Sequence, residues 1–352
     1  MQNWENNIRR VVPYVPGEQP KLKDIVKLNT NENPYPPSPK VTEALEVLDT
    51  ADLRLYPDPS CEVLVHAIAA YYGLSDEQVF VGVGSDDVLA MAFMTCFNSE
   101  KPLLFPDITY SFYDVWADML RIPYEQIPLT EDFTIRKEDY YRENGGIIFP
   151  NPNAPTGVEL GQNDIEDIVS HNPDSIVIVD EAYVDFGAVS ALPLIEKYDN
   201  VLVVQTFSKS RSLAGMRIGF AMGSKKLIAY INAVKYSFNS YTMDRTALAA
   251  GTASIEDKTY FEQSTAKVIA VREWTKEQLK KLGFVFGDSK ANFIFAAHPK
   301  YPAKELFAAL REAHIIVRYF DKPRIDNYLR ITIGTQEEMQ RLIAFLATYC
   351  KA

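Results

Sequence analysis

The feature that most constrains this sequence is a repeated pattern in which a short apolar run ends in a polar motif and gives way to a helical pattern. The runs have strand length, and they are Val79–Val83, Leu103–Phe105, Ile147–Phe149, Ser175–Val179, Val201–Val204 and Ile218–Met222. Short buried strands that alternate with helices predict an α/β fold with a mostly parallel sheet wrapped by helices. Because crossovers are right-handed, the polar motifs should meet at one edge of the sheet, where ligands bind.

The pattern changes after Tyr241. A helical stretch over about residues 257–282 leads to a second α/β unit with strands at Phe293–Ala297, Ile315–Val317 and Leu329–Ile333 and helices at Ala303–Glu312 and from Gln336. We therefore predict a large domain over residues 29–240 and a smaller C-terminal α/β domain over residues 241–352. Residues 1–28 are predicted to form an N-terminal arm that packs with the small domain.

Local signals predict further helices in the large domain. Ser38 and Pro39 are suited to the first positions of a helix, and Ser60 is suited to cap the next one. The predicted helices are Val41–Leu48, a helix from Ser60 to Gly73, Val88–Phe97 after a turn at Gly84–Asp86, Tyr110–Leu120, and Ile165–His171.

Composition excludes several classes of partner. The net charge of −11 argues against a nucleic-acid backbone or an anionic membrane surface. The three cysteines, Cys61, Cys96 and Cys350, are predicted to be reduced thiols in a cytoplasmic protein. The four histidines lack metal-ligand spacing, so no metal is expected. The polar N-terminus and the absence of a long apolar run predict neither a signal peptide nor a membrane helix.

The stretch from Val201 to Phe220 carries the most specific chemistry. Its apolar run ends shortly before Lys209, and burial at such a place disfavours the charged form of an amine. A neutral lysine is what attack on an aldehyde requires. Arg217, eight residues further on, is suited to a bidentate contact with phosphate. A lysine after a strand is usually a surface residue, but the combination of Ser208, Lys209 and Arg217 favours a cofactor site.

Residues 208–220 read S-K-x-x-x-L-A-G-x-R-x-G-F, which resembles the cofactor-lysine motif of fold-type I pyridoxal-phosphate aminotransferases. Asn29–Pro34 resembles the N-x-N-E-N-P signature of that family, and Asn151–Gly157 resembles its N-P-N-x-P-T-G. The resemblance extends over nearly the whole chain and is strongest to the histidinol-phosphate aminotransferases. Two positions depart from the pattern: Leu55 replaces the arginine of R-Y-P-D, and Ala154 replaces an asparagine.

Pyridoxal 5'-phosphate needs a lysine at its aldehyde, a carboxylate at its pyridine nitrogen and an anion site for its phosphate. The resemblance implies that Lys209 is the catalytic lysine and that Asp180 is the ring partner. Alone, Asp180 could equally cap a helix, and Tyr110 could be a core residue. The resemblance implies that these further residues bind the cofactor: Ser85, Asp86, Tyr110, Asn153, Tyr183, Thr206, Ser208, Arg217 and Tyr56.

Four residues are predicted to bind substrates. Arg330 is the only charge in an otherwise apolar or small-polar strand, which favours a buried partner, and it matches the arginine that binds the amino-acid carboxylate. Tyr14 and Arg318 match the positions that hold the phosphate of histidinol phosphate in this family. Arg318 could also bind the side-chain carboxylate of glutamate. Asn33, in the asparagine-rich motif, completes the set.

The predicted activity is transamination between a small-molecule amino donor and a 2-oxo acid. The resemblance points to histidinol phosphate and 2-oxoglutarate, which give imidazole-acetol phosphate and glutamate in histidine biosynthesis. An aromatic-amino-acid aminotransferase, a threonine-phosphate-decarboxylase-like enzyme, another decarboxylase or a C–S lyase could use the same scaffold. A cofactor-binding regulator has less support, because the roughly 28 residues before Asn29 are too few for a DNA-binding domain. The resemblance also implies a homodimer in which Tyr56 reaches the neighbouring subunit's cofactor phosphate.

Overall fold

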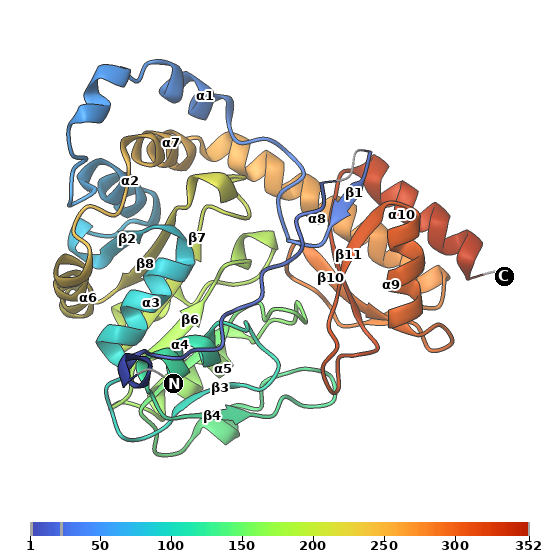
Figure 1. Ribbon diagram of the computed structural model, residues 1–352, viewed down its shortest axis with the longest axis horizontal. Coiled ribbons are helices and arrows are strands. Elements are labelled where there is room, and N and C mark those ends of the chain that lie inside the picture. The colour runs from blue at the N-terminus through green and yellow to red at the C-terminus, as the bar shows by residue number, and fades with distance from the viewer. Residues whose placement is uncertain (1–2, 22–23, 351–352) are drawn as a thin grey trace.

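The chain folds around two β-sheets, and the computed structural model describes residues 3–21 and 24–350 (Figure 1). The larger sheet has seven strands in the order β2-β8-β7-β6-β5-β3-β4. These strands are β2 (Val79–Gly82), β3 (Leu103–Pro106), β4 (Tyr124–Ile127), β5 (Gly146–Pro150), β6 (Val177–Asp180), β7 (Val201–Thr206) and β8 (Gly219–Gly223). The predicted α/β fold with a mostly parallel sheet is confirmed.

Strand β8 runs antiparallel to both of its neighbours, β2 and β7, whereas the other paired strands of this sheet are parallel. The reason is local: the loop after β7 returns directly to the sheet without a crossover helix, and Phe207 N–H donates to Ile218 O at 3.0 Å. Strand β8 therefore begins at the edge of the sheet where its neighbours β2 and β7 end. Arg217, just before β8, lies at that same edge.

Helices cover both faces of the large sheet because its central strands are apolar on both faces. Val177, Val179, Val201 and Val203 pack into one core, and the alternate residues of the same strands pack into the other. Helices α2, α5 and α7 contribute to the first core, and α3, α4 and α6 to the second. The α-helices of the chain up to residue 256 are α1 (Pro39–Glu46), α2 (Glu62–Tyr72), α3 (Gly84–Cys96), α4 (Tyr113–Leu120), α5 (Gln162–Ser170), α6 (Lys225–Phe238) and α7 (Arg245–Glu256).

The structure corrects several predicted boundaries. Ser38 caps α1 as expected, but Cys61 and not Ser60 is the N-cap of α2, where the carboxylate of Asp58 accepts the Glu62 N–H at 2.7 Å. The predicted turn at residues 84–86 is the first turn of α3, and α4 begins at Tyr113, three residues after its predicted start. Strand β4 and helices α6 and α7 were not predicted.

The smaller sheet has the order β1-β11-β12-β10-β9, with the long helix α8 beside it (Figure 1). Its strands are β1 (Val26–Leu28), β9 (Val285–Phe286), β10 (Phe293–Ala297), β11 (Ile315–Tyr319) and β12 (Leu329–Thr332). Its helices are α8 (Lys258–Lys281), α9 (Ala303–Glu312) and α10 (Gln336–Tyr349). The bounds predicted for β10 and α9 are confirmed. Among the described residues, no helix is both long and apolar enough to cross a membrane.

The N-terminal segment contacts both parts of the molecule. Strand β1 pairs in parallel with β11 of the small sheet. Before it, Glu18 forms an ion pair with Arg311 of α9, and Arg9 donates to the carbonyl of Met119 in α4 at 2.7 Å. The predicted division at residues 28 and 240 stays a prediction, and its residues 1–2, 22–23 and 351–352 lie outside the described chain.

Candidate active site

Two adjoining cavities, of about 160 and 230 Å³, lie where the carboxyl edge of the large sheet meets the small sheet. Both are lined by Lys209, Tyr110, Tyr183, Thr30 and Ala154, so they are two parts of one site. The larger is further lined by the predicted cofactor residues Ser85, Asp86, Asp180, Thr206, Ser208 and Arg217. The smaller is further lined by the predicted substrate residues Tyr14, Arg318 and Arg330.

Lys209 follows strand β7, whose six residues are all buried. Its Nζ donates to the carbonyl of Thr30 at 3.3 Å and lies 5.8 Å from the centre of the Tyr183 ring. The amine therefore reaches the point where the two cavities meet. A nucleophile at this point can act on groups held in either cavity.

The larger cavity contains an anion site built on the N-terminus of α3. Among the described residues, no side chain caps that end of the helix, so first-turn N–H groups remain available to a ligand. Arg217 lies beside it, with Nη1 3.4 Å from Ser208 Oγ and Nη2 3.4 Å from Asp86 Oδ2. Gly84 has φ +83°, and a Cβ there would lie 2.4 Å from Arg217 Nη2, so a glycine is needed for this arrangement.

Asp180 ends strand β6 at the floor of the same cavity and is almost completely buried. Burial raises the pKa of its carboxyl group to about 6, although the Tyr113 hydroxyl and the Ala182 N–H both donate to it. Oδ2 lies 2.8 Å from the Tyr113 hydroxyl. A buried carboxylate without a cation is a favourable partner for a protonated ring nitrogen, because the pair would recover the lost solvation.

Two predicted ring contacts line both cavities. Tyr110 donates its hydroxyl to Asp86 Oδ1 at 2.8 Å, and burial raises the pKa of that phenol. Tyr183 accepts a hydrogen bond from Asn31 Nδ2 at 3.0 Å. Each phenol is therefore held in a defined orientation around Lys209.

Asn153 does not line either cavity. Its Nδ2 donates to Ile108 O and to Thr156 Oγ1, both at 3.0 Å, while Oδ1 is buried without a partner in the described chain. The resemblance implies a donor to the cofactor's phenolate oxygen, but the atom left free here is an acceptor. The role of Asn153 stays a prediction.

Arg318 and Arg330 face each other as paired residues of β11 and β12. Arg330 Nη2 donates to Asn29 O at 3.0 Å, while its Nε is buried without a hydrogen-bond partner in the part of the chain that the structure describes. Burial lowers the pKa of this guanidinium. The ring of Phe320 lies 5.4 Å from the Arg318 guanidinium and 5.6 Å from that of Arg330. The sequence predicted a buried partner for Arg330, and the structure provides a backbone carbonyl and aromatic rings.

Tyr14 brings the N-terminal arm to this pair of arginines. Its ring stacks on Phe112, at the start of α4, with a centroid distance of 4.1 Å. Burial raises the pKa of the Tyr14 phenol, and the charges of Arg318 and Arg330 oppose that rise. Two guanidiniums and a phenol thus converge on the smaller cavity.

Besides Asn153, two further predicted site residues lie outside both cavities. Tyr56 is 79% exposed and its ring lies 4.7 Å from that of Tyr241. Both ends of the Asn33 side-chain amide are hydrogen-bonded within the protein: Nδ2 donates to Ser210 O, and Oδ1 accepts the Tyr35 N–H, each at 3.1 Å. In this structure Asn33 therefore contacts the loop that bears Lys209, and its predicted contact with substrate stays a prediction.

Sequence reasoning missed several residues of the site. Thr30 and Glu32 line the larger cavity together with Gln19, and Tyr113 supports Asp180. Thr30 and Glu32 belong to the asparagine-rich motif, so that motif was the available signal. Tyr113 gave no signal of its own, because a buried tyrosine on an apolar helix face is normally a core residue.

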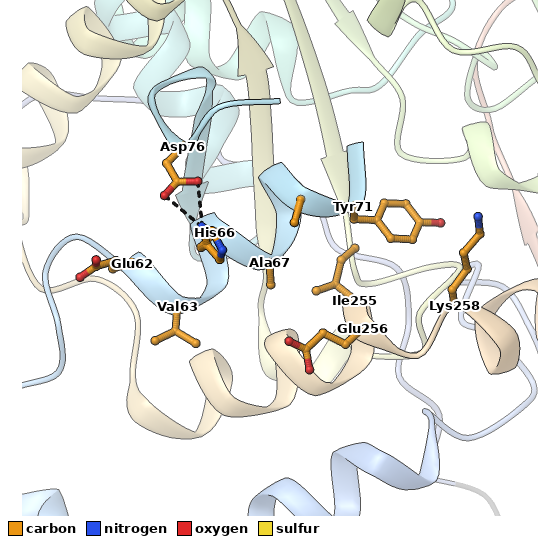
Figure 2. A pocket seen from close by; sticks show the side chains of 10 residues that line it. Glu62, Val63, His66, Ala67, Tyr71, Asp76, Ile255, Glu256 and Lys258 are labelled. Atoms are coloured by element: carbon orange, nitrogen blue, oxygen red, sulfur yellow. Dashed lines mark hydrogen bonds and ion pairs between the residues drawn. The ribbon is translucent and has the colours of Figure 1, made fainter. Parts of the chain in front are cut away.

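A larger cavity, of about 660 Å³, lies elsewhere, between α2 and the junction of α7 and α8 (Figure 2). His66 and Asp76 interact on one side of it at 3.3 Å, and Glu256 and Lys258 lie on the other. None of the predicted site residues lines it. Size alone therefore does not identify the functional site.

Comparison with known proteins identifies the class to which this fold and site belong. The family described as "Aminotransferase class I and II" matches residues 23–346. The chain therefore belongs to the class I and II aminotransferases.

Within that family, the chain belongs with the histidinol-phosphate aminotransferases. It is 54% identical to the histidinol-phosphate aminotransferase of Lactococcus lactis subsp. cremoris, over 99% of this chain and 98% of that one. It is 56% identical to the enzyme of that name from Acinetobacter baylyi, with the same coverage. The crystal structure of the Sinorhizobium meliloti histidinol-phosphate aminotransferase in complex with pyridoxal-5'-phosphate has the same fold, with a TM-score of 0.83, 24% identity and coverage of 92% of this chain and 90% of that one.

The residues of the larger cavity fit pyridoxal 5'-phosphate. The uncapped N-terminus of α3, Ser208 and Arg217 fit a phosphate, and buried Asp180 fits a ring nitrogen that carries a proton. Lys209 would lie at the aldehyde. The phosphate, the ring nitrogen and the aldehyde of the cofactor would each lie beside protein groups that can still form a hydrogen bond, an ion pair or a covalent bond with it.

Proposed function

We propose that this chain catalyses pyridoxal-phosphate-dependent transamination between histidinol phosphate and 2-oxoglutarate, as in histidine biosynthesis. The observation that carries the proposal is the pair Arg318 and Arg330, which face each other beside Lys209 without a carboxylate hydrogen-bonded to either among the described residues. Two guanidiniums suit a doubly charged phosphate in one half-reaction and the two carboxylates of glutamate or 2-oxoglutarate in the other. Membership of the histidinol-phosphate aminotransferases supports this choice.

The cofactor, when bound, supplies the electron-withdrawing ring that lets a proton leave the α-carbon of the substrate amine. Lys209 would take that proton as a general base and would deliver it again as a general acid. Asp180 holds a proton on the ring nitrogen, since its buried carboxylate is most stable beside a positive charge. Ser208, Arg217 and the N-terminus of α3 bind the phosphate and fix the ring relative to Lys209.

The residues that line the smaller cavity orient the substrate. With glutamate or 2-oxoglutarate, Arg330, whose Nε is buried without a partner in the described chain, binds one carboxylate, and Arg318 with Tyr14 binds the other. With histidinol phosphate, which carries a single anionic group, the two guanidiniums and Tyr14 bind the phosphate. These contacts place the α-carbon beside Lys209 Nζ, where the two cavities meet. Orientation of this kind supplies a large part of the rate enhancement.

A substrate panel tests the proposal. Purified holoenzyme is supplied with glutamate and with imidazole-acetol phosphate, phenylpyruvate or 4-hydroxyphenylpyruvate, with Lys209→Ala as the blank. We expect the highest kcat/KM with imidazole-acetol phosphate. A higher value with an aromatic 2-oxo acid would assign the chain to aromatic amino acids, and release of CO₂ from phosphothreonine would assign it to decarboxylation.

We also propose that the enzyme acts as a homodimer in which Tyr56 completes the neighbouring subunit's site. Support comes from Tyr56 itself, a tyrosine 79% exposed outside its own chain's cavities, and from exposed Leu53, Leu55 and Tyr241 nearby. Exposed apolar side chains grouped in this way suit a contact between subunits. The cytoplasmic location stays a prediction.

Mixed dimers test the role of Tyr56. Lys209→Ala and Tyr56→Ala chains are mixed and allowed to exchange subunits. If Tyr56 acts across the interface, a mixed dimer contains one site with both lesions and one with neither, and activity should recover to about half of wild type per mixed dimer. If exchange is verified and no activity returns, Tyr56 acts within its own chain.

A further inference from the structure

The turn that follows Lys209 is held by polar contacts that face away from the substrate. Ser210 is 3% exposed, and its hydroxyl donates to Asp185 Oδ2 at 2.5 Å. From the other side, Asn33 Nδ2 donates to the Ser210 carbonyl at 3.1 Å. Neither Ser210 nor Asp185 lines the two cavities, so these contacts act on the protein itself.

Arg211, the next residue, is fixed as firmly. Its guanidinium lies 4.1 Å from the centre of the Phe261 ring and 5.0 Å from that of Tyr71, and Nη1 donates to Ser254 O at 2.8 Å. Nη2 is buried without a hydrogen-bond partner in the described chain. The charge of this guanidinium attracts Asp185.

Asp185 thus contacts or attracts both residues that follow the catalytic lysine. It lies in a short 3₁₀ turn, Val184–Phe186, two residues after Tyr183, whose ring centre is 5.8 Å from Lys209 Nζ. One carboxylate therefore connects the segment that carries Tyr183 with the segment that carries Lys209.

We propose that Asp185 is a positioning residue for Lys209: through Ser210 and Arg211 it holds the main chain after the lysine where the amine meets the cofactor aldehyde. A lysine side chain is long and flexible, so the position of Nζ depends on how firmly its backbone is held. A displacement of about 1 Å at a reacting group can cost a hundredfold in rate. This proposal rests on the proposed function.

A purely structural role for Asp185 predicts a different result. The carboxyl is partly buried, and burial raises its pKa while Arg211 and Ser210 oppose the rise. Its replacement could therefore change the stability of the fold without any effect on Lys209. The test must measure the chemistry of the lysine separately from stability and from turnover.

The readout is the rate at which apoprotein captures added pyridoxal 5'-phosphate on Lys209, followed by borohydride reduction and peptide mass measurement. The variants are Ser210→Ala, Asp185→Asn and Asp185→Ala. Two exposed positions supply matched controls: Asp199→Asn, just before the start of β7 and so at the opposite end of that strand, and Ser170→Ala at the end of α5. Melting temperature, kcat and KM are measured for each protein.

We expect Ser210→Ala and Asp185→Ala to slow capture and to lower kcat by about tenfold or more, with KM for glutamate changed less than about twofold. Asp185→Asn keeps an oxygen that can accept the Ser210 hydroxyl, so it should lose less than Asp185→Ala. The controls should match wild type. If Asp185→Ala does not fold, the result for Ser210→Ala, which is a much smaller change, tests the proposal.

The proposal is overturned if Ser210→Ala and Asp185→Asn capture the cofactor at the wild-type rate, or if they lose melting temperature while capture and kcat are unchanged. Failure of the proposed function would look different. In that case the substrate panel would favour an aromatic 2-oxo acid or decarboxylation, whereas Ser210→Ala and Asp185→Ala would still capture the cofactor on Lys209 more slowly than wild type.

Discussion

The two walls of the active site are built on opposite principles. On the large-sheet side the polar groups already have protein partners: Asp180 accepts from Tyr113, and Lys209 donates to Thr30. On the small-sheet side Arg330 keeps a buried Nε without a partner in the described chain, and Arg318 faces it as a second positive charge. The reacting groups of the first wall are already held in place before a substrate arrives, and the second wall requires an anion to balance its charge.

This difference assigns the two walls to different kinetic constants. Groups held in place on the large-sheet side should act mainly on kcat, because they act on the reacting atoms. The arginines opposite them should act mainly on KM, because they bind the ends of the substrate. The predictions below are ordered by expected size, and each can break or sharpen this contrast.

Replacement of the lysine should have the largest effect. We expect Lys209→Ala to lower kcat by at least about 10³-fold while the fold persists, since general acid–base and covalent roles are lost together. Circular dichroism checks the fold, and borohydride reduction shows whether any lysine still binds the cofactor. Normal turnover with a reducible bond at another lysine would remove Lys209 from the mechanism.

The partner of the ring nitrogen should come next. Asp180→Asn should lower kcat by about 10²–10³-fold, because an amide cannot hold a proton on the ring nitrogen, while cofactor affinity falls much less. Fluorescence titration of apoprotein with the cofactor measures the affinity. Equal kcat in the variant and wild type would break the proposed assignment of Asp180.

The same carboxyl should make the stability of the apoprotein depend on pH. Its folded-state pKa, about 6, is above the ordinary value of 3.8, so its contribution is fully present below pH 4 and is lost as pH rises through 6. Wild-type apoprotein should therefore lose up to about 3 kcal/mol between pH 4 and pH 7 relative to Asp180→Asn. Urea unfolding of both proteins across this range measures the difference. If the free energy of unfolding depends on pH in the same way in both proteins, burial does not raise the pKa of Asp180.

Replacement of the arginines should change KM, whereas replacement of Lys209 or Asp180 should change kcat. Arg330→Ala and Arg318→Ala should each raise KM about tenfold to a hundredfold, as expected for a lost hydrogen bond to a charged group of about 1.5–3 kcal/mol. Arg318→Ala should weaken both histidinol phosphate and glutamate. A loss confined to kcat in either variant would contradict the contrast between the two walls.

The smallest effect is expected at the phenol of the arm. Tyr14→Phe keeps the stacked ring on Phe112 and removes one hydroxyl, so KM for histidinol phosphate should rise about tenfold and KM for glutamate should change less. Steady-state kinetics with each substrate in turn gives both values. Unchanged kinetics with histidinol phosphate would favour an aromatic amino acid as substrate.

Most of the fold could be predicted from the sequence because its signals are local. The apolar runs give the strands, and bounds such as Phe293–Ala297 and Ala303–Glu312 follow from composition and period alone. The failures are also local. Strand β4, Tyr124–Ile127, reads Y-E-Q-I and was not predicted, because it lacks an apolar run. It lies at the edge of the sheet, where Glu125 and Gln126 are exposed.

The site divides in the same way. Lys209, Asp180 and Arg217 stand in motifs next to strand ends, so their type and spacing indicate their chemistry. Tyr113 and Asp185 stand in no such motif. Each acts through a hydrogen bond to a residue distant in the sequence: Tyr113 contacts Asp180, 67 residues away, and Asp185 contacts Ser210, 25 residues away.

The sequence by itself determined the class of fold, the family and the chemical groups that the reaction needs, because these follow from local pattern and from motif. Only the tertiary structure decided which of those groups meet and which are already paired. It placed Asn33 against Ser210 and outside the two cavities, and it left Arg330 half-buried beside Arg318 without a carboxylate hydrogen-bonded to it in the described chain. The physical reason is that burial and pairing depend on every segment that packs around a group, and no single segment of sequence carries that information.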